Sequence, residues 1–454
     1  MRFYLLLVLL LQLPLCHASD KKSLERLIQY VDNSGNLNSE GQQYYNKDRY
    51  PELIREDLSV LYRSFEKSPE GFQPDADFTW KRNSVIYFLE LLLLESILTE
   101  RHRVLDERMR ANTYDGTNSP LAKVPLDDLP NLDGATSTLP LRLVLISRML
   151  GSHAQWMHLM EDGFFRMLMG KPQPWEFFPR VEPGRDFNSR RDARIHAMLL
   201  NNVLTPNSQT AHAYQKLFAE DNLLVINAVS PEAVANLAPG NFEKKESVRN
   251  RAVQQVLSKE QVSHIECKII GYDALVALVH VHNPVNSLTL DQIRAIYRSP
   301  DGVRWNILSA AASGQSAVPL IRNPDSGTAM LMKDLVFNGV MPEIPRSAPH
   351  IRLLEMGALI NGLSNFYAIG FSVQYYEQYI CPSAYTKTLA VDGVYPAAET
   401  IGSGSYKLRA PIYAAIRRSE PVNSPARLVY DFLTTPDGQE LIRSAGYYPL
   451  KPSR

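Results

Sequence analysis

The chain has 454 residues, of which 45% are hydrophobic and 21% are charged, so it is long enough to form more than one folded domain. Lysine plus arginine and aspartate plus glutamate both number 48, and this balance argues against the broad positive field by which nucleic-acid-binding proteins attract their ligand. Any site for an anion must therefore be built locally.

The N-terminus carries the pattern of an export signal. Arg2 precedes an apolar run over residues 3–15 that is too short to span a bilayer, and Ala18 suits the position before a signal-peptidase cut. We therefore predict a cleaved signal peptide over residues 1–18 and a periplasmic or otherwise extracytoplasmic protein. The alternative is a lipoprotein anchored through Cys16, although the leucine before it is unfavourable for lipidation.

Residues 19–127 predict an N-terminal helical region with polar faces. Residues 85–98 are strongly apolar but are interrupted by Glu90 and Glu95, and their length of ~14 residues fits a buried helix rather than a membrane span. We interpret the region as a helical bundle packed on the main body, with a module that docks a partner as the alternative. A stretch rich in Asn, Asp, Pro and Gly at 112–131 predicts a domain boundary.

Beyond that boundary, short apolar runs alternate with amphipathic stretches, which is typical of α/β layers. The predicted strands are 223–226, 274–281, 317–321 and 412–416, and the predicted helices are 288–297, 329–337 and 426–433. Two helix starts are well marked, because Thr289 with Gln292 predicts a capping box and Thr435 before Pro436 predicts a capped first turn.

Three segments place hydrogen-bond donors at predicted helix starts, and the sharpest is residues 322–328. There Arg322 follows a predicted strand, and Ser326, Gly327 and Thr328 lead into a helix. Free N–H groups at a helix N-terminus favour an anion, glycine admits a close backbone approach, and a guanidinium offers two parallel donors. An ordinary capped helix beside a surface arginine explains the segment equally well.

The other two segments gather hydroxyl groups before further predicted helices. Their hydroxyl residues are Thr136, Ser137 and Thr138 in the first segment and Ser208 and Thr210 in the second. Taken alone, each segment is better explained as a loop with a helix cap. His280 and His282 share a face of one predicted strand, but no third ligand is in view, so we predict no metal site.

The three segments, in this order, resemble those of the phosphate-binding proteins of ABC transporters, the PstS type. Residues 133–141 resemble the family's opening DGST…PL loop, residues 208–217 its S-x-T-x-x-A-Y segment, and residues 322–328 its R-x-x-x-S-G-T phosphate loop. Further landmarks are residues 271–279, 283–297 with Trp305, 367–371, 391–394 and 446–450. The resemblance covers residues 128–450.

The resemblance implies an α/β fold of the two-lobed type II periplasmic-binding-protein class with an additional N-terminal helical region. Lobe 1 would hold residues 128–274 and 413–454, lobe 2 would hold residues 275–412, and strands would cross between the lobes near 271–279 and 411–416. The implied function is the binding of a small oxyanion, phosphate first, for delivery to the membrane subunits of an ABC importer, with no enzymatic activity, cofactor or metal. Cys267 and Cys381 would lie in different lobes, which disfavours a disulfide between them.

Carried over residue by residue, the resemblance implies that both lobes contact the ligand. The implied ligand-binding residues are Thr136, Ser137, Thr138, Ser208 and Thr210 from lobe 1 and Arg322, Ser326, Gly327 and Thr328 from lobe 2. The chain departs from the family after the predicted strand at 223–226, where phosphate binders often place an acid that accepts a proton from the ligand. Residues 227–230 hold no carboxylate, which leaves sulfate-like and other oxyanions open.

Two other functions stay open at this point. The first is a scaffold or sensor that has kept the fold, has lost tight binding and acts through its N-terminal helical region. The second is an exported phosphatase-like hydrolase, which would need an activated nucleophile or bound metals. The sequence pattern identifies neither of those catalytic features.

Overall fold

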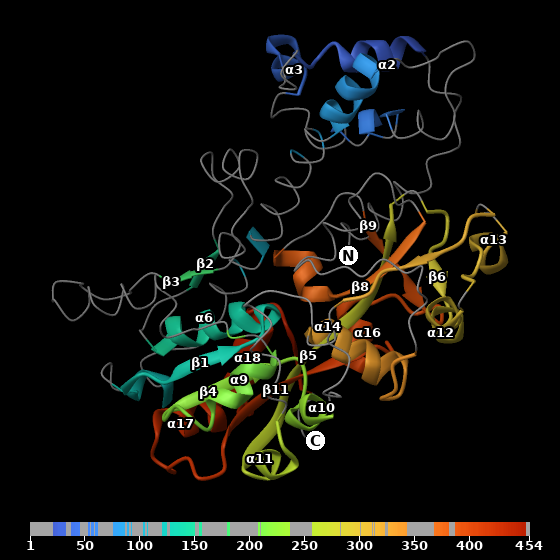
Figure 1. Cartoon of the computed structure of the whole chain (residues 1–454). Helices are drawn as coiled ribbons and strands as arrows, with labels where there is room; N and C mark the ends of the chain where they lie inside the picture. Colours follow the sequence, from blue (N-terminus) through green and yellow to red (C-terminus); the bar gives the residue numbers. More distant parts are fainter. Residues whose placement is uncertain are drawn as a thin grey trace. The chain divides into compact units, whose positions relative to one another are not determined.

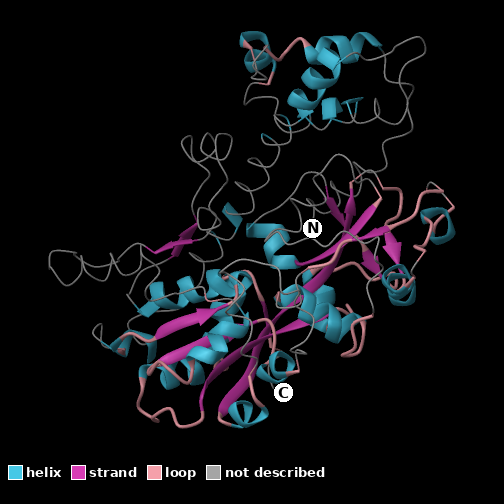
Figure 2. Cartoon of the chain, in the orientation of Figure 1, coloured by secondary structure: helices cyan, strands magenta, loops and turns pink. Residues whose placement is uncertain are grey.

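The computed structural model divides the chain into two compact units, Met1–Ile97 and Leu98–Arg454 (Figures 1 and 2). The structure describes residues 21–32, 38–45, parts of 53–107, 120–124, 128–149, 154–156, 179–181, 208, 210–236, 257–281, 283–299, 301–310, 312, 314–322, 326–342, 367–380 and 386–450. The predicted signal peptide, Cys16, His282 and Cys381 lie outside these residues.

The described part of the first unit contains helices α2 (Lys21–Ile28) and α3 (Ser39–Tyr44), and a buried carboxyl anchors its core. Asp57 is 3% exposed and accepts a hydrogen bond of 3.1 Å from the hydroxyl of Tyr45. The Arg26 guanidinium lies 3.7 Å from the same carboxylate and 5.6 Å from the centroid of the Tyr44 ring. The cation and the phenol partly offset the burial of the Asp57 carboxyl, which still raises its pKa.

The second unit is a mixed α/β structure, as predicted, with strands joined in the order β1-β4-β11-β5-β8-β7, while β12 and β9 also pair with β5. These strands are β1 (Asn131–Gly134), β4 (Leu223–Asn227), β5 (Ile265–His280), β7 (Val318–Pro319), β8 (Ala368–Val373), β9 (Thr386–Thr388), β11 (Arg409–Arg417) and β12 (Tyr448–Pro449). Two small pairs stand apart, β6 (Ser287–Leu288) with β10 (Ala390–Val391) and β2 (Ala154–Trp156) with β3 (Pro179–Val181).

One long strand, β5, pairs with one group of strands along its first part and with another group along its second part. Up to Ala274 it pairs antiparallel with β11 and β12, and from Leu275 onward it pairs antiparallel with β8 and β9. We call β1, β4, β11, β12 and β5 up to Ala274 the first half, and β7, β8, β9 and the rest of β5 the second half. The chain returns to the first half at Arg409, where β11 begins. A strand shared by two halves is what the predicted crossing at 271–279 requires.

Helices cover both faces of the first half (Figure 1). In the part of the chain that the structure describes, the helices of the second unit are α6 (Leu139–Met149), α9 (Thr210–Lys216), α10 (Pro231–Ala235), α11 (Lys259–Ser263), α12 (Leu290–Arg298), α13 (Trp305–Leu308), α14 (Gly327–Leu331), α16 (Ala398–Ser403), α17 (Pro425–Phe432) and α18 (Pro436–Ser444). Short helical turns lie at Pro120–Lys123, Thr136–Thr138, Met332–Val336 and Tyr376–Ile380. Leu224 and Ile226 of β4 pack with α6, α17 and α18, whereas Leu223 and Val225 pack with α9. Burial on both faces explains the unbroken apolar run of β4.

The helix caps that were predicted from residues close together in the sequence are confirmed. The capping box is confirmed, because the Gln292 N–H donates to Thr289 Oγ1 over 3.1 Å and the Thr289 N–H donates to Gln292 Oε1 over 2.8 Å. Thr435 likewise caps α18. Several predicted bounds differ from the observed ones. The strand predicted at 317–321 is Val318–Pro319, and the strand predicted at 412–416 is Arg409–Arg417. β5 begins at Ile265 rather than 274, and the helix predicted at 329–337 begins at Gly327 and turns into a π-helix at Met332.

Within the described residues, no helix is long and apolar enough to cross a membrane, and no group of three or more His, Cys, Asp or Glu side chains is arranged to hold a metal ion. His280 is fully buried. Cys267 forms no disulfide, and burial raises the pKa of its thiol to about 12.

Candidate anion-binding site

The first two predicted donor segments lie next to a pair of parallel strands. β1 pairs parallel with β4, so their carboxyl ends lie at the same edge of the sheet. The turn Thr136–Thr138 comes directly after β1 and leads into α6, and α9 begins at Thr210. Ligand sites in α/β sheets form at the carboxyl ends of strands, and helix N-termini there supply unpaired N–H groups.

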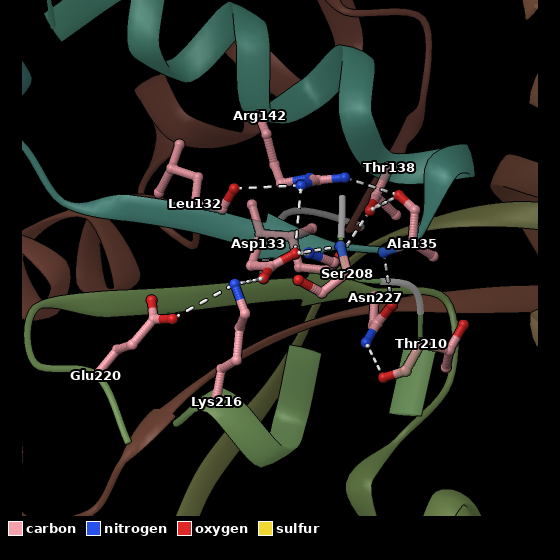
Figure 3. Close-up of polar contacts among 12 residues, drawn as sticks. Leu132, Asp133, Ala135, Thr138, Arg142, Ser208, Thr210, Lys216, Glu220 and Asn227 are labelled. Atoms are coloured by element: carbon pink, nitrogen blue, oxygen red, sulfur yellow. Dashed lines mark hydrogen bonds and ion pairs between the residues drawn. The ribbon is translucent and has the colours of Figure 1, made fainter. Parts of the chain in front are cut away.

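A buried carboxylate, Asp133, joins the first segment to the second (Figure 3). Its Oδ1 atom accepts hydrogen bonds from the backbone N–H of Gly134 at 2.7 Å and of Ser208 at 2.9 Å. Its Oδ2 atom lies 3.3 Å from the ammonium of Lys216 on α9. Residues 75 positions apart are thereby held together by one fully buried side chain.

Arg142 on α6 is also fully buried and orients the same loop. Its guanidinium donates to the carbonyl of Leu132 at 3.2 Å and to that of Ala135 at 2.9 Å, and it lies 3.9 Å from Asp133. Burial lowers the pKa of Arg142 to about 10, which the neighbouring carboxylate of Asp133 opposes. Lys216 additionally lies 3.4 Å from Glu220, so two cations and two carboxylates balance in this network.

The three predicted ligand residues of the first segment differ in how closely they are bound into the fold. Thr138 is 1% exposed, and its Oγ1 atom lies 2.9 Å from the carbonyl oxygen of Ala135 and 2.6 Å from that of Ile226. Its single hydroxyl proton is therefore directed at the backbone. Thr136 and Ser137 are partly exposed, and the Ser137 carbonyl accepts a 2.6 Å hydrogen bond from the hydroxyl of Tyr447.

The turn after β1 requires a glycine at position 134. Its φ is +155°, and a Cβ atom there would lie 1.9 Å from the carbonyl oxygen of Ile226. No side chain fits such a contact, so the glycine allows β1 to approach β4 before the chain turns into the first segment.

The third predicted segment meets the second, although the two come from different halves of the sheet. Ser326 caps α14, because its Oγ atom accepts the N–H of Ala329 at 3.1 Å. A Cβ atom at Gly327 would lie 3.2 Å from Thr210 Oγ1 and 4.0 Å from a methyl of Val229. Thr210 is 3% exposed, Ser326, Gly327 and Thr328 are partly buried, and Arg322 is partly buried after β7.

A second contact between the halves lies one turn further along the chain. The Lys333 ammonium donates to the carbonyl oxygen of Asn236 at 3.0 Å. Asn236 is the C-cap of α10, the end of the helix at which a cation is favoured.

Besides Arg142, three further residues that organise this region were not predicted as site residues from the sequence. Asp133 and Asn227 are fully buried and Tyr447 is 2% exposed, and each hydrogen-bonds a backbone group of one of the predicted segments. Asp133 carried a signal, since an acid that immediately precedes a required glycine at a strand end is a common loop anchor. The other two roles depend on partners 17 to 310 positions away.

No family profile and no curated protein matches this sequence. Among solved structures, a phosphate ABC transporter substrate-binding protein from Clostridium perfringens with bound phosphate is 16% identical, with 71% of this chain and 99% of that chain covered and a TM-score of 0.42. An ABC-type phosphate transport receptor from Vibrio cholerae is 18% identical, with 57% and 97% covered and a TM-score of 0.39. PstS from Borrelia burgdorferi is 13% identical, with 71% and 98% covered and a TM-score of 0.37.

Proposed function

We propose that the second unit binds a small oxyanion, with phosphate as the first candidate, where the three donor segments converge. The observation that carries the proposal is the contact between Gly327 and Thr210, together with the Asp133 bond to Ser208. Segments that were selected by sequence for their donors, and that are separated by up to about 190 positions, lie against one another. The proposed ligand-binding residues are Thr136, Ser137, Ser208, Thr210, Arg322, Ser326, Gly327 and Thr328, with Thr138 supporting the first segment.

The electrostatics of the described residues favour an anion over a cation. Asp133 is balanced by Arg142 and Lys216, so its charge is compensated within the fold. The segments then offer backbone N–H groups, hydroxyls and the Arg322 guanidinium, all of which can donate to an oxyanion. We therefore propose capture of the ligand without chemical conversion. The N-terminal pattern supports export, and the resemblance to phosphate-binding proteins supports delivery of the anion to an ABC importer.

A second candidate is a scaffold or sensor that has lost tight binding. It is favoured by the fact that the hydroxyl of Thr138 and the amide of Asn227 are engaged by protein groups, and that Thr210 is 3% exposed. Binding experiments separate the two candidates.

The test is calorimetric titration of the purified protein with phosphate, sulfate and small carboxylates. For the anion that binds, Arg322→Lys keeps the charge but loses the planar pair of donors, so we expect affinity to fall roughly tenfold to a hundredfold. Arg322→Ala should lower it further. Arg298→Lys is the matched control, because Arg298 lies on α12 over the ring of Phe337 and in none of the three segments.

The outcomes are distinct. Loss of affinity in both Arg322 variants, with the control unchanged, supports the proposed site. Tight binding retained in both variants removes Arg322 from the site. Absence of binding by the wild type to every anion tested supports the scaffold or sensor.

A further inference from the structure

Asn227 occupies a buried position between the first two donor segments. It is the last residue of β4, it is fully buried, and its backbone pairs with Tyr413 of β11. Its side chain leaves the carboxyl end of the strand between the turn that follows β1 and the first turn of α9 (Figure 3). A buried polar side chain in such a place must find partners, because an unsatisfied buried polar group costs about 1–3 kcal/mol.

Both polar atoms of the Asn227 amide are hydrogen-bonded. Its Oδ1 atom accepts from the backbone N–H of Ala135 at 2.9 Å, and its Nδ2 atom donates to the backbone carbonyl of Thr210 at 3.0 Å. The same amide interacts with the buried phenol of Tyr214, whose own proton is donated to the carbonyl of Val229 at 2.6 Å. Because an N–H faces one end and a carbonyl faces the other, only one orientation of the amide satisfies the network.

Both contacted backbone groups set the position of a donor segment. Ala135 precedes the turn Thr136–Thr138, and its carbonyl accepts from Arg142 Nη2 at 2.9 Å and from the N–H of Thr138 at 3.1 Å. Because the N–H of Ala135 is bound by Asn227 as well, hydrogen bonds hold the peptide groups on both sides of Ala135. Thr210 is the first residue of α9 and lies against Gly327.

We infer that Asn227 is a positioning residue. Its amide holds the first and second donor segments in the relative position in which both can contact the anion. The inference rests on the proposed function but extends it to a residue that does not itself contact the ligand in this arrangement. Among short side chains of this length, only an amide can accept from Ala135 and donate to Thr210 without having to hold a titratable proton. The lack of a carboxylate after β4 is then a requirement of this network.

The decisive variant is Asn227→Asp, which has almost the same shape. At low pH the protonated carboxyl of this variant again offers one acceptor and one donor. When the carboxyl is ionised, its second oxygen faces the carbonyl of Thr210 and the oxygen of Tyr214, and acceptors repel one another. The titratable groups nearest this position are Tyr214 on α9 and Tyr413 on β11, both neutral because burial raises their pKa values, and the Asp133 carboxylate on the neighbouring strand β1.

We therefore expect a pH-dependent loss of binding. At about pH 8 the Asn227→Asp variant should bind sulfate and phosphate at least roughly tenfold more weakly than the wild type, and at about pH 5 the ratio should return toward one. Comparing the affinities of the variant and the wild type at the same pH cancels the titration of the ligand, because both proteins meet the same ligand species. Asn227→Ala loses both bonds and should bind weakly at both pH values.

Asn222 provides the matched control at the other end of β4. Its Nδ2 atom donates to the carbonyl of Asp128 at 3.0 Å, and its Oδ1 atom accepts from the N–H of Ala426 at 2.9 Å. Asn222→Asp therefore removes the same kind of bridge without touching a donor segment. Its affinity for the anion should stay within about twofold of the wild type at both pH values, whatever happens to its stability.

Amide hydrogen exchange gives a readout that needs no ligand. The Asn227 variants should exchange faster than the wild type in residues 135–141 and 210–216 together, and Asn222→Asp should not. If Asn227→Asp binds as tightly as the wild type at about pH 8, or if the Asn222 control loses as much affinity, the positioning role is wrong. If the wild type binds no oxyanion, the proposed function fails, and unchanged exchange in the two segments would overturn the positioning role as well.

Discussion

Asp273 should make the stability of the second unit fall as the pH rises through neutrality. The residue lies on β5 just before the strand passes from the first half to the second, and it is 3% exposed. Its Oδ1 atom accepts from the N–H of Ala274 at 2.8 Å and from the N–H of Tyr375 at 3.1 Å. Burial raises the pKa of this carboxyl from 3.8 to about 7, and the two N–H donors only partly oppose that effect.

The sign and size of the effect follow from the two pKa values. A carboxyl whose pKa is raised in the folded state contributes stability that is fully present below the unfolded pKa of 3.8 and is lost as the pH rises through about 7. Between about pH 5 and pH 8, this one group should lower the free energy of unfolding by about 2.5 kcal/mol. Asp273→Asn keeps a carbonyl oxygen for both N–H groups and does not titrate.

The assay is urea unfolding of the wild type and Asp273→Asn at both pH values, followed by circular dichroism. The difference between the two proteins should shift by about 2.5 kcal/mol in favour of the variant at the higher pH, and other titrating groups cancel in the comparison. Asp392→Asn is the control, because its pKa is lowered, chiefly by the hydrogen bond from Lys407, and its contribution is lost only in acid. The same difference in unfolding free energy between variant and wild type at both pH values, or a shift of the opposite sign, would refute the reasoning.

Two further predictions concern single atoms. Gly134→Ala should abolish stable folding of the second unit, because its Cβ would lie 1.9 Å from the carbonyl of Ile226, whereas Gly402→Ala on α16 meets nothing within 4 Å and should stabilise by about 0.5–1 kcal/mol. Thermal unfolding of both variants checks the contrast, and a well-folded Gly134→Ala would contradict it. Cys267, with a pKa of about 12, should react with a maleimide about a thousandfold more slowly in the native protein than after unfolding, as measured by mass spectrometry of its peptide. Equal rates in the two states would contradict the raised pKa of the thiol.

Elements with local signals were predictable from the sequence. The strand at 223–226 is unbroken in hydrophobicity because both of its faces are covered, and the cap at Thr289 is encoded within four residues. The first nine residues of β5 escaped prediction for a physical reason. Glu266, Cys267, Lys268 and Ile269 are partly or well exposed there, so the apolar pattern begins only near the crossing.

The donor segments could be predicted from hydroxyls and glycines at helix starts. The direction of each hydroxyl group within them could not. Thr138 and Ser137 look alike in sequence, yet the hydroxyl of Thr138 is directed at backbone carbonyls, while Ser137 is partly exposed. That distinction depends on the pairing of β1 with β4, which brings Ile226 beside Gly134. A register between strands about ninety positions apart is set by tertiary packing rather than by local pattern.

The same argument explains why an absence in the sequence was open to two interpretations. The lack of an acid at 227–230 weakens the resemblance to phosphate binders, because a carboxylate there would accept a proton from the ligand. In the structure, position 227 must donate to Thr210 as well as accept from Ala135, and an ionised acid cannot do both. The residue type at the end of β4 is thus constrained first by the two segments it joins. Under the proposed function, discrimination among oxyanions would therefore come from the groups that those segments and α14 present to the ligand.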